Sequence, residues 1–557
     1  MLNTNKKHIR HLAAICHAKG IKHVIVSPGS RSAPLVIAFA RHSEIQLTPI
    51  VDERSAAFFA LGMAQQLQQP VALVCTSGSA ALNYAPALAE AYYQKIPLVV
   101  FTADRPHEWI NQQDGQAIVQ KNVFENYILK SFELPCEPAT ETELWHSDRI
   151  VNEAINIAIV QQGPVHINIP LREPLYEQVE ITTTCIPKII QQPLNKTSET
   201  ISPLVKSELK AASKIIILGG NGTFDFSEYN LEKFGNCVFL SEINCNTNNI
   251  AFHHNLDALI NAIPNNETEK FQPDILITFG GAIVSKKMKE FLRNNSPKQH
   301  WHLNKYNEHI DTFQCLTHVV NASIYEVIGE LEKWKIKSSE YQKTWNELAD
   351  KVKIKQEIFL SSAPFSDFKA YQNLTSKISL LKSVNLHLGN STPVRYAAYF
   401  NWGSNTQINS NRGVSGIDGT VSTAAGAAFV NGKTTILITG DIAFMYDSNG
   451  LWNKQLPKNI KIIVINNQGG NIFRLINNEE TLPELNEYFE TPHPYSIEHI
   501  AKAFDIPYYF CYSEATLESS LKAFFEPSEK PAILEIKTDG KLSAKVFKDF
   551  IKQLKKN

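Results

Sequence analysis

Short apolar runs alternate with stretches of helical periodicity through the first third of the chain. Each run is rich in aliphatic residues and is bounded by glycine, proline or polar residues, which is typical of a buried strand. The runs lie at 23–27, 46–51, 70–75, 97–103 and 164–170. Strands that alternate with helices in this way predict a doubly wound α/β sheet with parallel strands.

The same alternation occurs twice more along the chain. A second group of runs lies at 214–220, 237–240 and 274–281, and a third group at 384–389, 406–410, 434–439, 461–466 and 531–537. A polar stretch rich in threonine and proline, without helical period, separates the first two groups and is typical of a linker. We therefore predict three doubly wound parallel-sheet domains, at 1–180, 204–340 and 341–557, with a linker at 181–203.

Composition and charge limit the partners and the location that we expect for this protein. With 557 residues and 43% hydrophobic content the chain is long enough for several cores, and 54 basic against 55 acidic residues leave a net charge of −1. This charge gives no global attraction to nucleic acid or to an anionic membrane. The N-terminus lacks a signal-peptide pattern, and no apolar run is long enough to span a bilayer. We expect a cytoplasmic protein with no nucleic-acid partner and no stable membrane insertion.

The most informative polar residues follow two strands of the third group. The run 434–439 ends in Gly440-Asp441, and the run 461–466 ends in Asn467 and two glycines. The 26 residues between Asp441 and Asn467 leave room for one helix, expected at about 444–454, and a return strand. Ends of neighbouring parallel strands lie roughly 4.8 Å apart, so the carboxylate and the amide oxygen can share one hard cation.

Oxygen ligands of this kind suit Mg²⁺, which usually completes its shell with water and phosphate oxygens. Gly469 and Gly470 allow a ligand to approach the backbone closely. The pattern therefore predicts a metal-bound diphosphate, with Mn²⁺ as a possible substitute because oxygen sites discriminate weakly among such ions. The alternative is that both polar dipeptides are ordinary turns after buried strands, and their pairing at crossover spacing argues against it.

These residues also carry a resemblance. Gly-Asp, about 26 residues and then Asn-Asn resembles the metal motif of the thiamine-diphosphate-dependent enzymes, whose ligands are an Asp, the second Asn and a carbonyl two residues later. The resemblance implies Asp441, Asn467 and Gly469 as metal ligands and Gly440 as a cofactor contact. It makes 1–180 the pyrimidine-binding domain, 204–340 the central domain, and 341–557 the diphosphate- and Mg-binding domain of a thiamine-diphosphate-binding fold.

Thiamine chemistry needs a carboxylic acid against the pyrimidine ring of the cofactor. Glu53 lies between the run 46–51 and an apolar helix rich in small residues, and the resemblance assigns it this role, both in catalysis and in cofactor binding. The alternative is an acidic residue that only stabilises the helix N-terminus through the macrodipole.

Four further motifs resemble one branch of the family more specifically: SPGSRSAPL, TSGSAALNYAPAL, TADRP and SNRGVSGIDGTVSTAAG, at 27–35, 76–88, 102–106 and 410–426. This branch works in menaquinone biosynthesis. It removes CO₂ from 2-oxoglutarate and adds the succinyl unit to isochorismate in a conjugate, Stetter-like addition. Both substrates are dicarboxylates.

Such substrates give the arginines of these loops a function, because a guanidinium binds a carboxylate through two hydrogen bonds. By resemblance, the substrate pocket contains Ser30, Arg31, Arg105, Gln116, Arg395 and Arg412. The turn Asn390-Ser391 corresponds to the family's cofactor-binding turn. Ile417, Ile472 and Phe473 are expected beside the cofactor, although core packing explains apolar residues equally well.

The chain departs from the family in the middle domain. The family often has a Lys-Arg pair where this chain has Lys286-Lys287. Lysine can neutralise a carboxylate but lacks the fixed fork of arginine, which puts the orientation of the second substrate in doubt. Solvated surface lysines are the alternative.

Two other functions remain open at this stage. One is another thiamine-diphosphate-dependent carboligase or decarboxylase, similar to acetohydroxyacid synthase, and the arginine set argues against its small monoacid substrates. The other is a silent relative that binds the cofactor only, against which Glu53, Asp441 and Asn467 argue. The family resemblance also implies a homodimer or homotetramer, in which the first domain of one subunit and the third of another enclose the cofactor.

Overall fold

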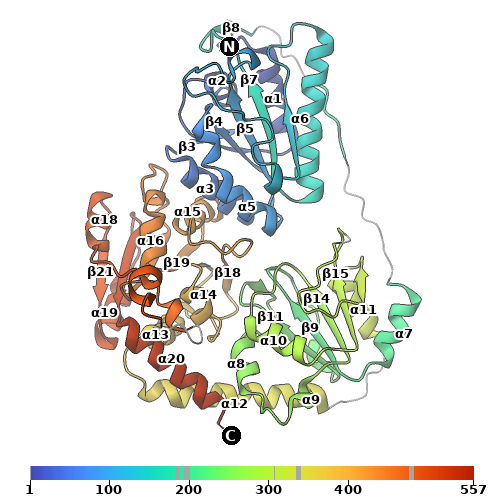
Figure 1. The fold of residues 1–557 in the computed structure, drawn as a ribbon, viewed down its shortest axis with the longest axis vertical. Helices are drawn as coiled ribbons and strands as arrows, with labels where there is room; N and C mark the ends of the chain where they lie inside the picture. The colour runs from blue at the N-terminus through green and yellow to red at the C-terminus, as the bar shows by residue number, and fades with distance from the viewer. Residues whose placement is uncertain are drawn as a thin grey trace.

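The structure is a computed structural model that describes residues 2–181, 187–192, 201–306, 308–333, 340–475 and 482–556. Figure 1 shows three α/β units, the first above the other two, with the chain ends at opposite extremes of the molecule. Each unit is built on a six-stranded sheet in which every strand is parallel to its neighbours. The predicted fold class of three parallel-sheet α/β units is confirmed.

The first sheet has the order β3-β2-β4-β5-β7-β6. Its strands are β2 (His23–Val26), β3 (Gln46–Pro49), β4 (Val71–Cys75), β5 (Leu98–Asp104), β6 (Lys130–Glu133) and β7 (Val165–Pro170). The helices are α1 (Lys7–Ala18), α2 (Ala33–Ala40), α3 (Glu53–Leu67), α4 (Ser79–Leu82), α5 (Ala85–Gln94) and α6 (Glu141–Gln161). A short antiparallel pair joins β1 (Leu2–Thr4) to β8 (Gln178–Glu180). The five strands predicted for this unit are confirmed, and β6 at the sheet edge was not predicted.

The middle sheet has the order β13-β11-β9-β14-β15-β16. Its strands are β9 (Ile215–Gly219), β11 (Cys237–Ser241), β13 (Phe252–His253), β14 (Ile275–Phe279), β15 (Gln299–Leu303) and β16 (His318–Val320), and β10 (Gly222–Thr223) pairs with β12 (Cys245–Asn246) beside it. The helices are α7 (Pro203–Ala211), α8 (Leu256–Ala262), α9 (Thr268–Phe271), α10 (Lys286–Asn294) and α11 (Ile324–Glu332).

The third sheet has the order β18-β17-β19-β20-β22-β21. Its strands are β17 (Val384–Leu388), β18 (Thr406–Asn409), β19 (Thr434–Gly440), β20 (Ile460–Asn466), β21 (Tyr508–Cys511) and β22 (Ala532–Lys537). The helices are α12 (Glu340–Ser362), α13 (Asp367–Ile378), α14 (Thr392–Ala397), α15 (Thr420–Asn431), α16 (Asp441–Tyr446), α17 (Ile472–Leu475), α18 (Ile497–Ala503), α19 (Glu514–Phe524) and α20 (Gly540–Leu554). Because α12 packs against α8 and α9 of the middle unit and against α20 of the third, the exact domain boundaries stay a prediction.

The first and third units share one hydrophobic core. Helices α3 and α15 cross between the two sheets, as Figure 1 shows, and their buried alanines and phenylalanines belong to a single cluster with β4 and β20. A Cβ atom on Gly62 of α3 would collide with the carbonyl oxygen of Thr423, and one on Gly426 of α15 with that of Phe59. Two glycines therefore allow the helix backbones to touch, which fixes how the first sheet lies on the third.

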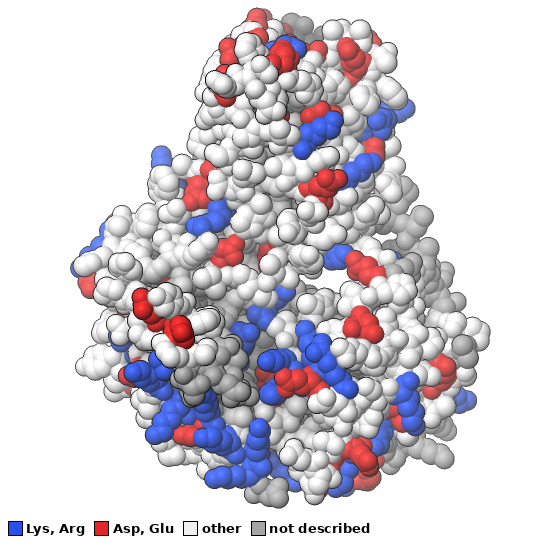
Figure 2. All heavy atoms as spheres, viewed as in Figure 1, with Lys and Arg blue, Asp and Glu red and all other residues white. Residues whose placement is uncertain are grey.

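Charge on the surface is local, as the near-zero net charge predicts. Figure 2 shows lysines and arginines gathered at the lower left, over the C-terminal helix α20. That helix carries Lys541, Lys545, Lys548 and Lys552 at helical spacing on one face and buries Val546, Phe550 and Leu554 on the other. Among the described residues, no helix combines the length and the apolar character needed to span a membrane.

Candidate functional site

The strand ends predicted to bind metal lie side by side. Strands β19 and β20 are parallel neighbours, with Gly440 opposite Ile465, so Asp441 and Asn467 follow adjacent strands as predicted. The helix predicted at 444–454 is wrong in its bounds: α16 begins at Asp441 itself and ends at Tyr446, before a short 3₁₀ turn at Ser448–Leu451. An acidic first residue stabilises the helix N-terminus, and the buried Asp447 ends the helix by binding Ser422 of α15.

The Asp441 carboxylate is buried, with 2% of its surface exposed. It accepts hydrogen bonds from the backbone N–H groups of Ile442 (2.8 Å) and Gly469 (2.9 Å), and it lies 3.2 Å from Nε2 of His493. The Asn467 side chain donates through Nδ2 to Asp367 (2.8 Å). Its Oδ1 atom is buried and has no hydrogen-bond partner among the described residues.

A buried oxygen without a partner is costly unless a ligand occupies the position in front of it. The same edge holds two more side chains with unpaired buried atoms in the described structure, namely both amide atoms of Asn471 and Nδ1 of His493. No described atom lies within 4 Å of the position that a Cβ on Gly440 would take. Carboxylate and amide oxygens beside open space fit a hard cation that carries phosphate oxygens. Asn471 and His493 were not predicted from the sequence.

Glu53 occupies the first position of α3. Asp52 caps this helix by accepting the N–H of Ser55 (3.1 Å), so Glu53 is not needed as the cap. Burial raises the pKa of Glu53, its own backbone N–H opposes this, and the Asp52 carboxylate raises it further. The half-buried carboxyl group is therefore shifted toward its protonated form, as a proton donor to a bound ring requires.

Arg412 lies in a buried loop that Asn390 organises. Asn390 donates to the carbonyl oxygens of Asn411 and Gly416, both at 2.6 Å, and its Oδ1 accepts from Arg412 at 2.8 Å. Burial lowers the pKa of Arg412 to about 10, and the neighbouring Arg395 guanidinium adds to this effect. The Asn390 side chain is thus engaged in holding the loop, which leaves its backbone and Ser391 for a cofactor.

A fully buried carboxylate of the first unit holds the same loop. Glu90, in α5, accepts the backbone N–H groups of Gly413 (2.6 Å) and Val414 (2.8 Å) and is 2% exposed. Position 412 is therefore fixed relative to the first sheet as well as to the third. Glu90 was not predicted, because 323 residues separate it from Gly413.

The middle unit adds charges to this region. Asp257 lies close enough to Lys287 and Arg395 for their charges to lower its pKa, against the larger effect of burial, which raises it. Lys287 also pairs with Glu290 (2.7 Å), and Lys286 is exposed at the start of α10. Lys289, which was not predicted, lies near Arg412: burial lowers its pKa, the Glu242 carboxylate raises it, and the Arg412 charge lowers it.

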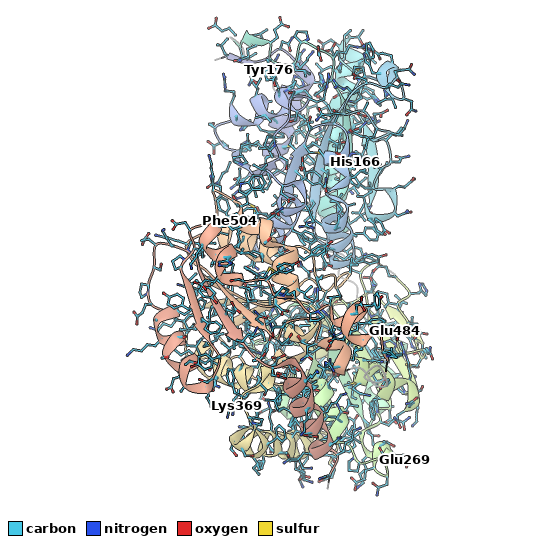
Figure 3. All side chains as sticks on the ribbon, turned by 60° about the vertical axis from the view of Figure 1, so that its left-hand side comes forward. His166, Tyr176, Glu269, Lys369, Glu484 and Phe504 are labelled. Atoms are coloured by element: carbon cyan, nitrogen blue, oxygen red, sulfur yellow. The ribbon has the colours of Figure 1, made fainter. Side chains whose placement is uncertain are left out.

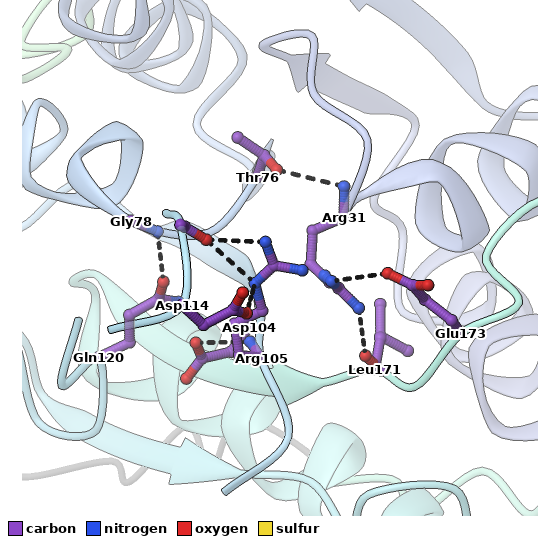
Figure 4. Close-up of polar contacts among 10 residues, drawn as sticks. Arg31, Thr76, Gly78, Asp104, Arg105, Asp114, Gln120, Leu171 and Glu173 are labelled. Atoms are coloured by element: carbon purple, nitrogen blue, oxygen red, sulfur yellow. Dashed lines mark hydrogen bonds and ion pairs between the residues drawn. The ribbon is translucent and has the colours of Figure 1, made fainter. Parts of the chain in front are cut away.

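Arg31 and Arg105 lie together in the first unit, at the ends of β2 and β5 (Figure 4). Arg31 is 6% exposed and donates to the carbonyl oxygen of Leu171 (2.9 Å) and to Glu173 (3.3 Å). Arg105 pairs with Asp114 (2.9 Å) and donates to the carbonyl oxygen of Gly115. Both guanidinium groups therefore have partners within the chain.

The remaining predicted residues surround these groups. Ser30 and Gln116 are exposed, and Gln116 adopts a positive φ of 55° where its backbone lies over Gly78. Ile417, Ile472 and Phe473 are half-buried, and Phe473 contacts the ring of Phe489 with centroids 5.5 Å apart. None of the three belongs to a buried core cluster of the described residues, so core packing alone does not explain them.

Comparison with known proteins agrees with this geometry. Residues 7–126 match the model of the N-terminal TPP binding domain of thiamine pyrophosphate enzymes, residues 389–536 the C-terminal TPP binding domain, and residues 239–378 the middle domain. The match to the C-terminal domain includes both Asp441 and Asn467.

Curated relatives align along nearly the whole chain. A 2-succinyl-5-enolpyruvyl-6-hydroxy-3-cyclohexene-1-carboxylate synthase of Flavobacterium johnsoniae is 41% identical over 97% of both chains. The synthase of Flavobacterium psychrophilum is 42% identical over 97% of both, and that of Cytophaga hutchinsonii is 38% identical over 99% of both. The chain belongs to the 2-succinyl-5-enolpyruvyl-6-hydroxy-3-cyclohexene-1-carboxylate synthase family of thiamine-diphosphate-dependent enzymes.

Proposed function

We propose that this chain removes CO₂ from 2-oxoglutarate and joins the succinyl unit to isochorismate, giving 2-succinyl-5-enolpyruvyl-6-hydroxy-3-cyclohexene-1-carboxylate. The observation that carries the proposal within the structure is the pair Asp441 and Asn467 on adjacent strand ends, with a buried Asn467 oxygen that lacks a described partner. The names of the relatives supply the product. The similarity to acetohydroxyacid synthase considered above is the weaker alternative, because the relatives align end to end under one name.

In this proposal Asp441, Asn467 and the carbonyl oxygen of Gly469 would hold Mg²⁺ or Mn²⁺, which would neutralise the charge of the cofactor's diphosphate. Thiamine diphosphate supplies the electron sink that stabilises negative charge on the carbonyl carbon after CO₂ leaves. Burial raises the pKa of Glu53, which favours the form that can donate a proton to the pyrimidine ring. Ile417, Ile472 and Phe473 shield the reacting atoms from water.

The substrates carry carboxylates, and the chain supplies cations for them. Arg395 and Arg412 lie close enough for one charge to lower the pKa of the other, so an anion between them is favoured. A substrate carboxylate between the two guanidinium groups relieves their repulsion. It also accepts charge-assisted hydrogen bonds in a site that is partly shielded from water. Arg31, Arg105, Ser30, Gln116, Lys286 and Lys287 complete the proposed substrate-binding set. Because Arg31 and Arg105 already bind Glu173 and Asp114, a substrate exchanges one carboxylate partner for another.

The assembly and the location stay predictions. A homodimer or homotetramer follows from the family resemblance, and light scattering with the cofactor present measures it directly. The cytoplasm is expected from the sequence, and fractionation of cells that express the chain tests it.

A single assay tests the proposed reaction. The purified chain is supplied with thiamine diphosphate, Mg²⁺, 2-oxoglutarate and freshly prepared isochorismate, and the product is identified by mass spectrometry. The expected result is the succinylated cyclohexene carboxylate together with CO₂. Replacing 2-oxoglutarate by pyruvate is the matched control, and preferential turnover of pyruvate would overturn the proposal. Cofactor binding without turnover of either acid would instead identify a silent relative.

A further inference from the structure

A fully buried carboxylate lies directly behind the proposed metal ligand Asn467. Asp367 is the first residue of α13 and has 0% of its surface exposed. Its Oδ2 atom accepts from Nδ2 of Asn467 at 2.8 Å, across 100 residues of sequence. Lys369, two residues further along α13, marks this helix in the lower half of Figure 3.

The other carboxyl oxygen of Asp367, Oδ1, also has hydrogen-bond partners. Oδ1 accepts from the hydroxyl of Thr538 (2.6 Å) and from that of Ser543 (3.1 Å). The Ser543 oxygen in turn accepts the backbone N–H of Asp367 (3.0 Å), so its hydrogen points to the carboxylate. Burial raises the pKa of Asp367, whereas the hydrogen bonds from Thr538, Asn467 and Ser543 lower it. In this geometry both carboxyl oxygens are acceptors. All three side chains around Asp367 therefore act as donors.

This arrangement decides which way the Asn467 amide faces. An asparagine amide has one accepting and two donating sides, and the hydrogen-bond network determines its orientation. With Nδ2 directed to Asp367, Oδ1 must face the opposite way, where it is buried and lacks a described partner. A cation requires the oxygen and is repelled by the amide hydrogens.

We propose that Asp367 is a positioning residue that fixes the Asn467 amide with its oxygen toward the divalent metal. The inference rests on the metal site of the proposed function. Side chains that orient a metal ligand from behind typically change metal affinity 10- to 100-fold when they are replaced. A purely structural role at the start of α13 would affect folding and leave metal affinity unchanged.

The test is Asp367→Asn, measured as binding of Mn²⁺ by electron paramagnetic resonance with thiamine diphosphate present and substrates absent. The new amide keeps an oxygen for Thr538 and Ser543 and turns its NH₂ group toward Asn467. Asn467 must then present its own oxygen to that NH₂ group, which turns its nitrogen toward the metal. We expect Mn²⁺ affinity to fall about 10- to 100-fold.

Two further variants separate orientation from charge. Asp367→Ala removes the negative charge but leaves Asn467 free to turn, so it should lose less affinity than Asp367→Asn. Equal losses would mean that charge alone acts and would overturn the inference. The double variant Asp367→Asn with Asn467→Asp, the reversed pair, exchanges the two side chains. The amide at 367 can then donate to the carboxylate at 467, whose other oxygen faces the metal, and we expect most of the Mn²⁺ affinity to return.

Melting temperatures without metal show whether each variant folds. If Asp367→Asn does not fold, the reversed pair still decides the question, because a folded reversed pair without Mn²⁺ binding would contradict the inference. Failure of the reaction is distinguishable: a wild-type chain that binds Mn²⁺ but does not use 2-oxoglutarate overturns the proposed reaction and leaves the role of Asp367 in place.

Discussion

The first and third units have the same strand order but present different chemistry at the same edge. Numbered along each unit, both sheets run 2-1-3-4-6-5, and α3 and α15 are equivalent helices that follow the second strand of each. The middle sheet runs 3-2-1-4-5-6 instead. In the first unit the loops after the first and fourth strands carry Arg31 and Arg105, whereas in the third unit the loops after the third and fourth strands carry Asp441 and Asn467. The same topology therefore places loops at the same strand ends, and the residues in those loops determine the chemistry of each edge.

The two edges also differ in which kinds of buried polar atom lack a partner. Arg31 and Arg105 find carboxylates and carbonyl oxygens within the first unit. In the third unit Asn467, Asn471 and His493 retain buried atoms without a partner among the described residues. At the first edge the buried atoms without a described partner include the hydroxyls of Ser27 and Ser77. The third edge differs in the type of atom, because amide oxygens and an imidazole nitrogen are groups that can ligate a metal.

The largest expected effect is at the third edge. Asp441→Ala should weaken binding of thiamine diphosphate with Mg²⁺ at least about 100-fold, because it removes a charged ligand from the proposed metal. Isothermal titration calorimetry with and without EDTA measures the loss. Thr76→Ala is the matched control, since Thr76 directly follows the equivalent strand β4 of the first unit. Equal losses in both variants would remove the contrast between the edges.

The next prediction concerns the contribution of the first unit to turnover. Glu53→Gln should lower turnover by about 10²- to 10⁴-fold, as expected for a lost proton-transfer group, while metal and cofactor still bind. Steady-state rates and calorimetry on the same preparation separate the two quantities. Wild-type turnover in this variant would exclude Glu53 from the chemistry and leave the first unit with a substrate-binding role only.

The equivalent helices make a symmetric prediction about stability. Gly62→Ala in α3 and Gly426→Ala in α15 each place a Cβ against a carbonyl oxygen of the other helix. Each should destabilise the chain by about 1–3 kcal/mol, the usual cost of overpacking, measured as a lower melting temperature. Gly329→Ala in α11 is the control, because nothing lies within 4 Å of its Cβ position, and it should be neutral or stabilising. Tolerance of either interface alanine would show that the helices can separate.

The last comparison concerns how the equivalent helices begin. Helix α3 is capped by the side chain of Asp52. Helix α15 has Gly419 as its N-cap and therefore no side-chain cap, and Asp447, which follows α16, accepts from Ser422 instead. Burial raises the pKa of Asp447 from 3.8 to about 7. The unfolded chain therefore ionises this group at lower pH than the folded chain does, and folding stability falls as the pH rises from about 4 to 7.

Asp447→Asn should remove this pH-dependent loss, because its amide can still accept from the Ser422 N–H and donate to the Ser422 hydroxyl. Each unit of pKa shift corresponds to about 1.4 kcal/mol. We expect the variant to gain stability relative to the wild type between pH 5 and 8, measured by urea denaturation across that range. Parallel curves for the two proteins would show that Asp447 titrates normally in the folded chain.

The apolar strands could be predicted from the sequence, and the polar or peripheral ones could not. Strands β6 and β21 lie at sheet edges; β6 has the sequence KSFE without an apolar run, and β21 has the sequence YYFC, which is aromatic and lacks aliphatic residues. Strand β15 has the sequence QHWHL and is buried nonetheless, because His300 and His302 both bind the hydroxyl of Thr278 at 2.9 Å. Burial of a histidine depends on a partner in another strand, which a single segment does not reveal.

The same limit applies to the candidate site. Asp441, Asn467 and Glu53 could be proposed from the sequence because each follows a strand in a recognisable motif, and their roles stay a prediction. Asp367, Glu90 and Lys289 carry no local signal, since a surface helix would equally well contain each of them. The helix predicted at 444–454 had the wrong bounds, because the sequence does not show that Asp447 contacts Ser422 of α15 where α16 ends.

The contact between Glu90 and the loop at 413–414 has a consequence for comparing relatives. The buried Glu90 carboxylate, in the middle of α5, accepts two backbone hydrogen bonds from a loop of the third unit. If either side is exchanged for a foreign sequence, a buried charge loses its donors, at a cost of several kcal/mol. Chimeras assembled from two relatives should therefore keep Glu90 and residues 410–414 from one parent, and these two segments are expected to change together during evolution.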